Sequence, residues 1–219
     1  MRARSSRRRK TTKANVFIIE SLGSIDEKEK RFEGQILSRI LHLGGKQSRY
    51  HYIRTKKELK KALESFGESG YRYLHLSCHG NKTSISTTRD TIRFSELNRL
   101  MKPYLKDKRL FISSCNAVND DLAATVIPSS KCFSIVGPDE AIDFADAAII
   151  YASFYHLMFR KDPRKMRRRN ILSTLRNVAK TFRVNMNYFS ISKTSERGYK
   201  GIPILGSKRR RRIRKHKLQ

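Results

Sequence analysis

The sequence predicts an α/β protein, a three-layer sandwich whose mostly parallel central sheet of five to six strands carries helices on both faces. Short continuous runs of β-branched and aromatic residues alternate along the chain with segments of helical periodicity. Strands that are apolar throughout are typical of parallel sheets buried on both faces. The chain of 219 residues, 38% of them hydrophobic, is long enough for one domain with a substantial core.

The first half of the chain alternates between strands and helices, and ordinary signals set the boundaries. Asp26 and Glu27 suit the first turn of a helix, whose apolar residues recur at helical spacing until Gly44. Thr55 has the side chain of a helix N-cap. The predicted elements are a strand over 15–19, a helix from Asp26 to Leu43, a strand over 48–53, a helix from Thr55 to Gly67, a strand over 71–77 and a hairpin within 81–94.

The second half continues this pattern and ends in an ambiguous segment. The stretch 143–159 is apolar almost all round, as expected for a helix packed against a sheet. Pro128 is expected to end the short helix that precedes it. Either 188–192 or 202–205 is expected to supply an edge strand. The predicted elements are a helix over 95–104, a strand over 110–113, a helix over 120–126, a strand over 132–136, a helix over 143–159 and a basic helix from about 165 to 183.

The net charge of +30 is concentrated in three blocks. Residues 1–13 hold seven basic residues and no acidic one, residues 208–219 hold eight and none, and residues 160–183 hold ten with one acidic residue. Because blocks of like charge repel themselves, we expect disordered basic tails at 1–13 and 207–219 around a single domain at 14–206. Such tails attract polyanions such as nucleic acid or an acidic protein, although a solubilising role explains them equally. Neither tail holds an aromatic residue for base stacking.

Cysteine usage and the lengths of apolar runs indicate a cytoplasmic protein. The three cysteines, Cys78, Cys115 and Cys132, are odd in number and lack the spacings of a disulfide framework, which favours free thiols in a reducing compartment. The longest apolar runs, such as 147–152, fall far short of the roughly 20 residues that a membrane span needs. The sequence has no Cys-x-x-Cys pair, and we expect neither a zinc site nor a cofactor.

Two predicted strands end in reactive residues. The strand over 71–77 leads into His79 and Gly80, and the strand over 110–113 leads into Cys115. Ligands of parallel sheets bind beyond the carboxyl ends of the strands. If the two strands are neighbours, His79 and Cys115 therefore emerge side by side. A thiolate nucleophile and an imidazole that manages its protons are what a cysteine peptidase needs.

These motifs resemble those of the caspase-like cysteine peptidases, which include caspases and separase, and are most similar to those of bacterial CHAT-domain proteases. A hydrophobic strand ending in His79-Gly80 precedes a hydrophobic strand ending in Ser-Cys115, and residues 137–155 resemble the CHAT segment after the fifth strand. The resemblance covers roughly residues 15–160. The Gln-Ala-Cys-x-Gly signature of true caspases is absent. The resemblance implies a caspase-like fold, and because no basic S1 pocket can be assigned, a caspase-like preference for aspartate is unsupported.

The resemblance also implies peptide hydrolysis by a Cys–His dyad. Cys115 would attack the scissile carbonyl, and His79 would protonate the leaving amine and later help to activate water. The backbone N–H groups of Gly80 and Cys115 would bind the oxyanion. The family requires no third acidic residue, and none is predicted. Core packing is the expectation for the other two cysteines, because a buried cysteine is a common small apolar filler.

Acidic residues gather after the fourth and fifth predicted strands. Most of them suit helix N-termini, where a negative charge stabilises by about 0.3–1 kcal/mol. Asp143 is also a candidate substrate-binding residue, because a carboxylate in the S1 pocket would select lysine or arginine. Both interpretations of Asp143 stay open. The residues concerned are Asp120, Asp121, Asp139, Glu140, Asp143 and Asp146.

Two functional hypotheses follow from these observations. The first is a caspase-like cysteine endopeptidase that acts on a protein substrate in regulation or defence and could need an activating or sensor protein. The second is a catalytically silent α/β scaffold that binds nucleic acid or an acidic protein through its basic tails. Loss of function on substitution of Cys115 or His79 distinguishes the first from the second.

Overall fold

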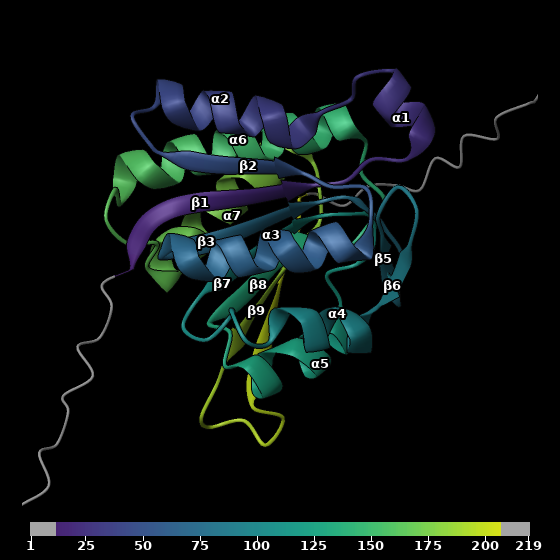
Figure 1. Cartoon of the computed structure of the whole chain (residues 1–219). Coiled ribbons are helices and arrows are strands. Elements are labelled where there is room, and N and C mark those ends of the chain that lie inside the picture. Colours follow the sequence, from purple (N-terminus) through teal and green to yellow (C-terminus); the bar gives the residue numbers. More distant parts are fainter. Residues whose placement is uncertain (1–11, 207–219) are drawn as a thin grey trace, which may run out of the picture.

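A seven-stranded sheet forms the middle layer of the molecule (Figure 1). The computed structural model describes residues 12–206. The strands of this sheet are β1 (Lys13–Glu20), β2 (Ser48–Tyr52), β3 (Tyr71–Ser77), β7 (Arg109–Ser113), β8 (Ser134–Pro138), β9 (Met186–Ile191) and β10 (Tyr199–Ile204). Their order is β10-β9-β8-β7-β3-β1-β2. The pairs among β1, β2, β3, β7 and β8 are parallel, whereas β9 and β10 pair antiparallel at one edge.

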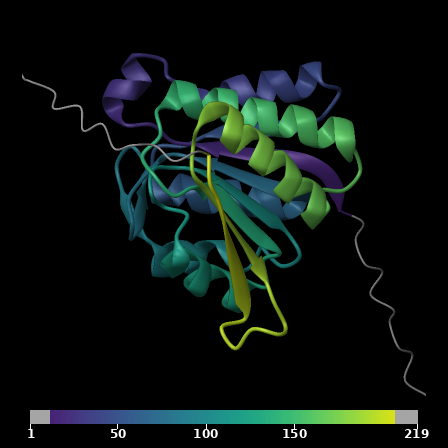
Figure 2. The ribbon, with the colours of Figure 1, turned by 180° about the vertical axis from the view of Figure 1, so that it is seen from behind.

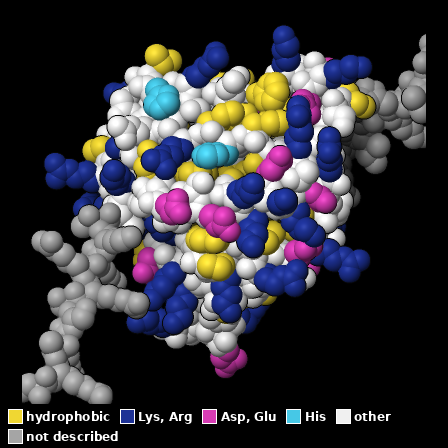
Figure 3. All heavy atoms as spheres, viewed as in Figure 1, with side chains coloured by type: hydrophobic (Ala, Val, Ile, Leu, Met, Phe, Trp, Pro, Cys, Tyr) yellow, Lys and Arg dark blue, Asp and Glu magenta, His cyan; other side chains and the backbone are white. Residues whose placement is uncertain are grey.

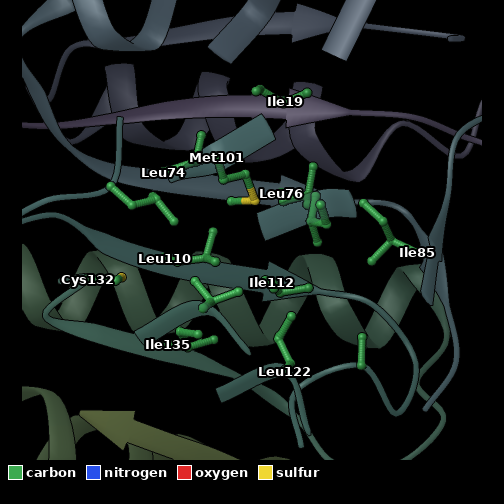
Figure 4. Close-up of a cluster of buried hydrophobic side chains, with 14 of the residues drawn as sticks. Ile19, Leu74, Leu76, Ile85, Met101, Leu110, Ile112, Leu122, Cys132 and Ile135 are labelled. Atoms are coloured by element: carbon green, nitrogen blue, oxygen red, sulfur yellow. The ribbon is translucent and has the colours of Figure 1, made fainter. Parts of the chain in front are cut away.

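Helices cover both faces of the sheet (Figures 1 and 2). One face carries α2 (Glu33–Leu43), α6 (Phe144–Lys161) and α7 (Arg168–Phe182), and the other carries α3 (Lys56–Ser69), α4 (Phe94–Met101) and α5 (Asp120–Ser130). Along β1, Val16 and Ile18 join the apolar cluster under α2 and α6, whereas Phe17 and Ile19 join the cluster under α3. Figure 4 shows part of the second cluster around Ile19. The predicted α/β sandwich with a mostly parallel sheet is confirmed.

A small antiparallel sheet lies beyond the carboxyl ends of the parallel strands. It consists of β4 (His79–Gly80), β5 (Ser84–Ser86) and β6 (Thr91–Arg93). The predicted hairpin within 81–94 is therefore present, and the backbone N–H of Thr87 closes its turn on the carbonyl of Asp90. The short helix α1 (Ser24–Lys28) follows β1 at the same end of the sheet.

Three predicted elements differ in the structure. The helix expected over 26–43 is two helices, because Lys30 adopts the left-handed conformation at φ 58° and separates α1 from α2. The helix expected to end at Pro128 continues to Ser130, because the proline removes one N–H near the helix end while Val126 and Ile127 stay buried. The ambiguous segment 187–206 supplies two strands, β9 and β10, which raises the sheet to seven.

The predicted tails lie almost wholly outside the described residues. Of the tail predicted over 1–13, the structure describes Thr12 and Lys13, and β1 begins at Lys13. The tail predicted over 207–219 lies entirely outside. Among the helices of residues 12–206, none has both the length and the apolar character to cross a membrane.

Candidate active site

The carboxyl ends of β3 and β7 lie side by side, so the two strands that precede His79 and Cys115 are neighbours. Ser77 of β3 is in register with Ser113 of β7, and the backbone N–H of Cys78 donates to the carbonyl of Ser113 at 3.1 Å. His79 and Cys115 each come two residues after this aligned pair. They therefore leave the sheet at the same edge, from adjacent strands.

One short segment before α6 contacts both residues. The Sγ atom of Cys115 lies 3.4 Å from the carbonyl oxygen of Ile142 and 3.4 Å from its backbone nitrogen. The imidazole of His79 packs edge-on against the ring of Phe144, with centroids 5.2 Å apart. Both side chains are half-buried, so a ligand can reach them. The two residues thus flank the same three-residue stretch, 142–144, at the open edge of the sheet.

A carboxylate that sequence reasoning missed binds the histidine. The Nε2 atom of His79 lies 2.7 Å from Oδ2 of Asp26, and Asp26 also accepts a hydrogen bond of 2.9 Å from Arg31. An ionised carboxylate accepts hydrogen bonds and cannot donate one. It therefore selects the imidazole tautomer in which Nε2 carries the hydrogen and Nδ1 keeps its lone pair. The free nitrogen of the neutral imidazole can then accept a proton from a thiol.

Sequence signals for Asp26 pointed to a different role. Its acidic neighbourhood suits a helix N-terminus, but Asp26 is in the five-residue helix α1 with its side chain only 12% exposed. Asp26 lies close to His79 because β1, whose end leads into α1, is the neighbour of β3 in the sheet. Strand order is not visible in the local pattern of one sequence, and so the Asp26–His79 pair is not predictable from it.

The backbone around Gly80 is closely packed. A Cβ atom at Gly80 would lie 2.2 Å from Oγ of Ser114 and 3.1 Å from the carbonyl oxygen of Ser84. Any residue with a side chain would therefore force β4 away from the loop that carries Cys115. A glycine at this position is a packing requirement of the site, whatever its part in chemistry.

Neither backbone N–H group predicted for the oxyanion site takes part in the strand pairing. The N–H of Asn81 donates to the carbonyl of Ser84, so the next pair, Gly80 with Ile85, is of the non-hydrogen-bonded type. The N–H of Gly80 is therefore turned away from β5. The N–H of Cys115 donates to no backbone carbonyl among residues 12–206.

The buried carboxylate of Glu33 joins the carboxyl ends of β3 and β7. Oε2 of Glu33, at the start of α2, accepts hydrogen bonds from the hydroxyls of Ser77 at 2.8 Å and Ser113 at 2.7 Å. Oε1 of Glu33 lies 3.6 Å from Nε2 of His75, and both side chains are almost completely buried. The Nδ1 atom of His75 is 3.0 Å from the hydroxyl of Tyr155. His75 is thus a packed residue of the polar layer beneath the site.

A second buried carboxylate, Glu20, ends β1 beside this layer. It accepts hydrogen bonds from the N–H of Gly34 at 2.7 Å and from the hydroxyl of Tyr50 at 2.7 Å. Burial raises the pKa of Glu20 to about 7, although the two donors counteract it. The pKa of Tyr50 is raised in turn by its own burial and by the neighbouring Glu20.

A pocket of about 470 Å³ opens next to the histidine. The connection from α1 to α2, Lys30 to Glu33, forms one wall, and Asp143, Phe144 and the first turn of α6 form the other. Phe144 also packs on His79, so the pocket adjoins the candidate dyad. Asp143 is exposed on its wall, and within residues 12–206 its carboxylate has no ion-pair partner. The structure places Asp143 where a substrate side chain could meet it.

The other two cysteines are buried, and two of the predicted acids have the helix N-terminal position expected of them. Cys78 and Cys132 are buried in the core, and burial raises the pKa of each thiol to about 12, which keeps both protonated. Asp120 and Asp121 occupy the first turn of α5, as expected of helix N-terminal acids. Among residues 12–206, no group of three or more His, Cys, Asp or Glu side chains could hold a metal ion.

Comparisons with protein-family models and with curated proteins find no match for this chain.

The buried state of Glu20 predicts a pH dependence of stability. The folded chain retains a proton on Glu20 up to about pH 7, whereas the unfolded chain releases it near the ordinary value of 4.5. The stabilisation of the folded chain that comes from this bound proton is complete below pH 4.5 and is lost as the pH rises through 7. Relative to Glu20→Gln, the wild type should lose on the order of 3 kcal/mol of unfolding free energy between pH 4.5 and pH 8.

Urea denaturation at the two pH values measures this difference. The exposed Glu64→Gln variant on α3 is the control, since it removes one carboxylate without touching a buried one. An equal change with pH in the wild type, Glu20→Gln and Glu64→Gln would contradict the expected protonation of Glu20.

Proposed function

We propose that the chain is a cysteine endopeptidase in which Cys115 is the nucleophile and His79 the general base and acid. The observation that carries the proposal is the position of the two side chains at one sheet edge, on either side of the stretch 142–144. The hydrogen bond from His79 to Asp26 supports it further, because the bond leaves Nδ1 of the imidazole free to accept a proton. A third residue that orients the base is the usual arrangement of activated nucleophiles.

The chemistry begins with transfer of the Cys115 thiol proton to His79. The thiolate attacks the scissile carbonyl carbon, and the oxygen that becomes negative accepts hydrogen bonds from the N–H groups of Gly80 and Cys115. The carbon–nitrogen bond then breaks while His79 gives its proton to the leaving amine, and a thioester remains on Cys115. Water attacks the thioester as His79 removes its proton, and the sulfur leaves as the thiolate. Asp26 stabilises the imidazolium that forms in each half of the reaction.

The proposal includes the caspase-like family to which the strand-end motifs are similar, with the bacterial CHAT-domain proteases as its most similar branch. A protein substrate, a role in regulation or defence and dependence on an activating partner follow from that similarity. A cytoplasmic location is part of the same proposal, because Cys115 must remain a free thiol. The mostly parallel α/β sandwich is compatible with this assignment, and the same architecture also serves other functions.

The reactivity of Cys115 tests the proposal without the natural substrate or activator. A peptidyl probe with a thiol-directed electrophile should label Cys115 alone, since the thiols of Cys78 and Cys132 are buried. Removal of the base in His79→Ala should slow labelling by about 100-fold or more. Labelling is measured by mass spectrometry of the digested protein as a function of time.

His42→Ala is the matched control, because His42 is an exposed histidine on α2 away from this edge. It should label at the wild-type rate. Equal rates in His79→Ala and the wild type, or labelling of Cys132 in preference to Cys115, would rule out the dyad and favour the catalytically silent scaffold.

The pocket beside His79 predicts the residue that precedes the cleaved bond. The cations of the lining are Lys30 and Arg31, of which Arg31 is engaged by Asp26 and Glu29, whereas Asp143 faces the pocket without a cationic partner among residues 12–206. We therefore expect cleavage after arginine or lysine to exceed cleavage after leucine or aspartate. Asp143→Asn removes the ion pair expected between Asp143 and the arginine of the substrate. It should therefore lower kcat/KM on an arginine peptide about tenfold, which corresponds to about 1.4 kcal/mol.

Fluorogenic peptides with arginine, aspartate or leucine before the scissile bond provide the measurement. Asp146→Asn removes an exposed carboxylate one helical turn further along and outside the pocket lining, so it should leave the preference unchanged. Turnover of the leucine or aspartate peptide with none of the arginine peptide would contradict the role of Asp143 and leave the dyad untouched.

A further inference from the structure

A second pocket, of about 580 Å³, lies at the opposite end of the sheet from the candidate dyad. Its walls come from the amino ends of neighbouring parallel strands: Arg72 in β3, Arg109 at the start of β7, and Phe133 just before β8. The loop that leads into β7 and the connection between α6 and α7 complete it. Its lining consists of Thr12, Arg72, Tyr73, Lys106, Asp107, Arg109, Phe133, Lys165, Met166 and Arg167.

Positive charge dominates this lining. Five of its residues are lysine or arginine, and Asp107 is the one acidic residue among them. Across residues 12–206, none of the five forms an ion pair with a carboxylate. The pKa of the neighbouring Lys108 is lowered, first by burial and then by the positive charge of the nearby Arg72. An anion in the pocket would relieve the repulsion among these cations, which Asp107 offsets only in part.

Two of the cations are fixed by hydrogen bonds before any ligand arrives. The guanidinium of Arg72 donates to the hydroxyl and carbonyl of Thr12, each at 2.9 Å, and to the carbonyl of Arg164 at 3.1 Å. Arg109 donates to the hydroxyl of Ser134 at 2.8 Å. Both arginines are half-buried. Positive groups that are already ordered lose little conformational freedom when they bind an anion.

An exposed aromatic ring stands beside these cations. The side chain of Phe133 is 40% exposed, and the guanidinium of Arg109 lies 5.8 Å from the centre of its ring. Aromatic rings next to cationic groups are the platform on which proteins stack the bases of single-stranded nucleic acid. An acidic protein would use the cations but would have no base to place on the ring. The predicted basic tails lack an aromatic residue, and this pocket supplies one.

We propose that this cationic pocket binds single-stranded nucleic acid, with backbone phosphates on the lysines and arginines and a base against Phe133. The proposal is independent of the peptidase chemistry, which concerns the opposite edge of the sheet.

Fluorescence anisotropy with a labelled single-stranded RNA of mixed sequence tests the proposal on the full-length chain. The substitution Lys106→Gln/Lys165→Gln/Arg167→Gln removes three exposed charges of the pocket. The control Lys57→Gln/Lys60→Gln/Lys61→Gln removes three exposed charges from α3, on the face where Figure 3 shows many separate Lys and Arg side chains. Both variants lose the same net charge and keep both tails.

The pocket variant should bind the RNA at least tenfold more weakly than the control variant. Its slope of log affinity against log salt should also fall by about 0.7 for each phosphate contact removed. Equal affinities and slopes for the two triple variants would overturn the proposal, because they would show that net charge and the tails alone account for binding.

A second pair of variants separates nucleic acid from an acidic protein partner. Phe133→Ser should weaken binding of the single strand about fivefold or more through loss of base stacking, and should leave binding of duplex RNA unchanged. Phe182→Ser, at the exposed end of α7, is the control for removal of a surface aromatic ring. Unchanged affinity of Phe133→Ser for the single strand, or equally tight binding of polyglutamate, would overturn the assignment to nucleic acid.

Discussion

The carboxylate of Glu33 is the constraint on which the geometry of the candidate site depends. One of its oxygens binds the hydroxyls of Ser77 and Ser113, which are the last residues of two adjacent strands. Leaving two buried hydroxyls without an acceptor costs about 1–3 kcal/mol each. The strand ends are therefore held together two residues before His79 and Cys115. A site that needs a nucleophile and a base at fixed separation depends on such a link.

Above this link, each catalytic candidate is fixed by a different part of the chain. Asp26 binds the imidazole of His79 from helix α1, and the backbone of Ile142 contacts Cys115 from the segment before α6. The cationic pocket lies at the opposite end of the same strands. A protein with this arrangement could hold a nucleic acid at one end of the sheet and cleave a peptide at the other, without the two ligands competing for space.

The sequence predicts the α/β class, the parallel strands and the edge that carries His79 and Cys115, because these follow from apolar periodicity and from the residues at strand ends. It does not predict Asp26 as the partner of His79, because that contact depends on the order of strands in the sheet. Glu33 is hidden for the same reason, since the sequence places it within a predicted helix and its partners Ser77 and Ser113 come from two strands. The cationic pocket assembles five basic residues from separate elements and is likewise a product of tertiary structure.

The labelling rate of Cys115 by a peptidyl probe, measured in variants of the Glu33 link, tests the central claim most directly. Glu33→Ala should label at least tenfold more slowly than the wild type, and Glu33→Gln, which keeps an oxygen for both hydroxyls, should recover most of the rate. The double variant Ser77→Ala/Ser113→Ala removes the same two bonds and leaves Glu33 in place, so it reports on the link even if Glu33→Ala does not fold. Circular dichroism checks that each variant is folded. A wild-type labelling rate in folded Glu33→Ala or in the double serine variant would contradict the claim that this carboxylate aligns His79 with Cys115.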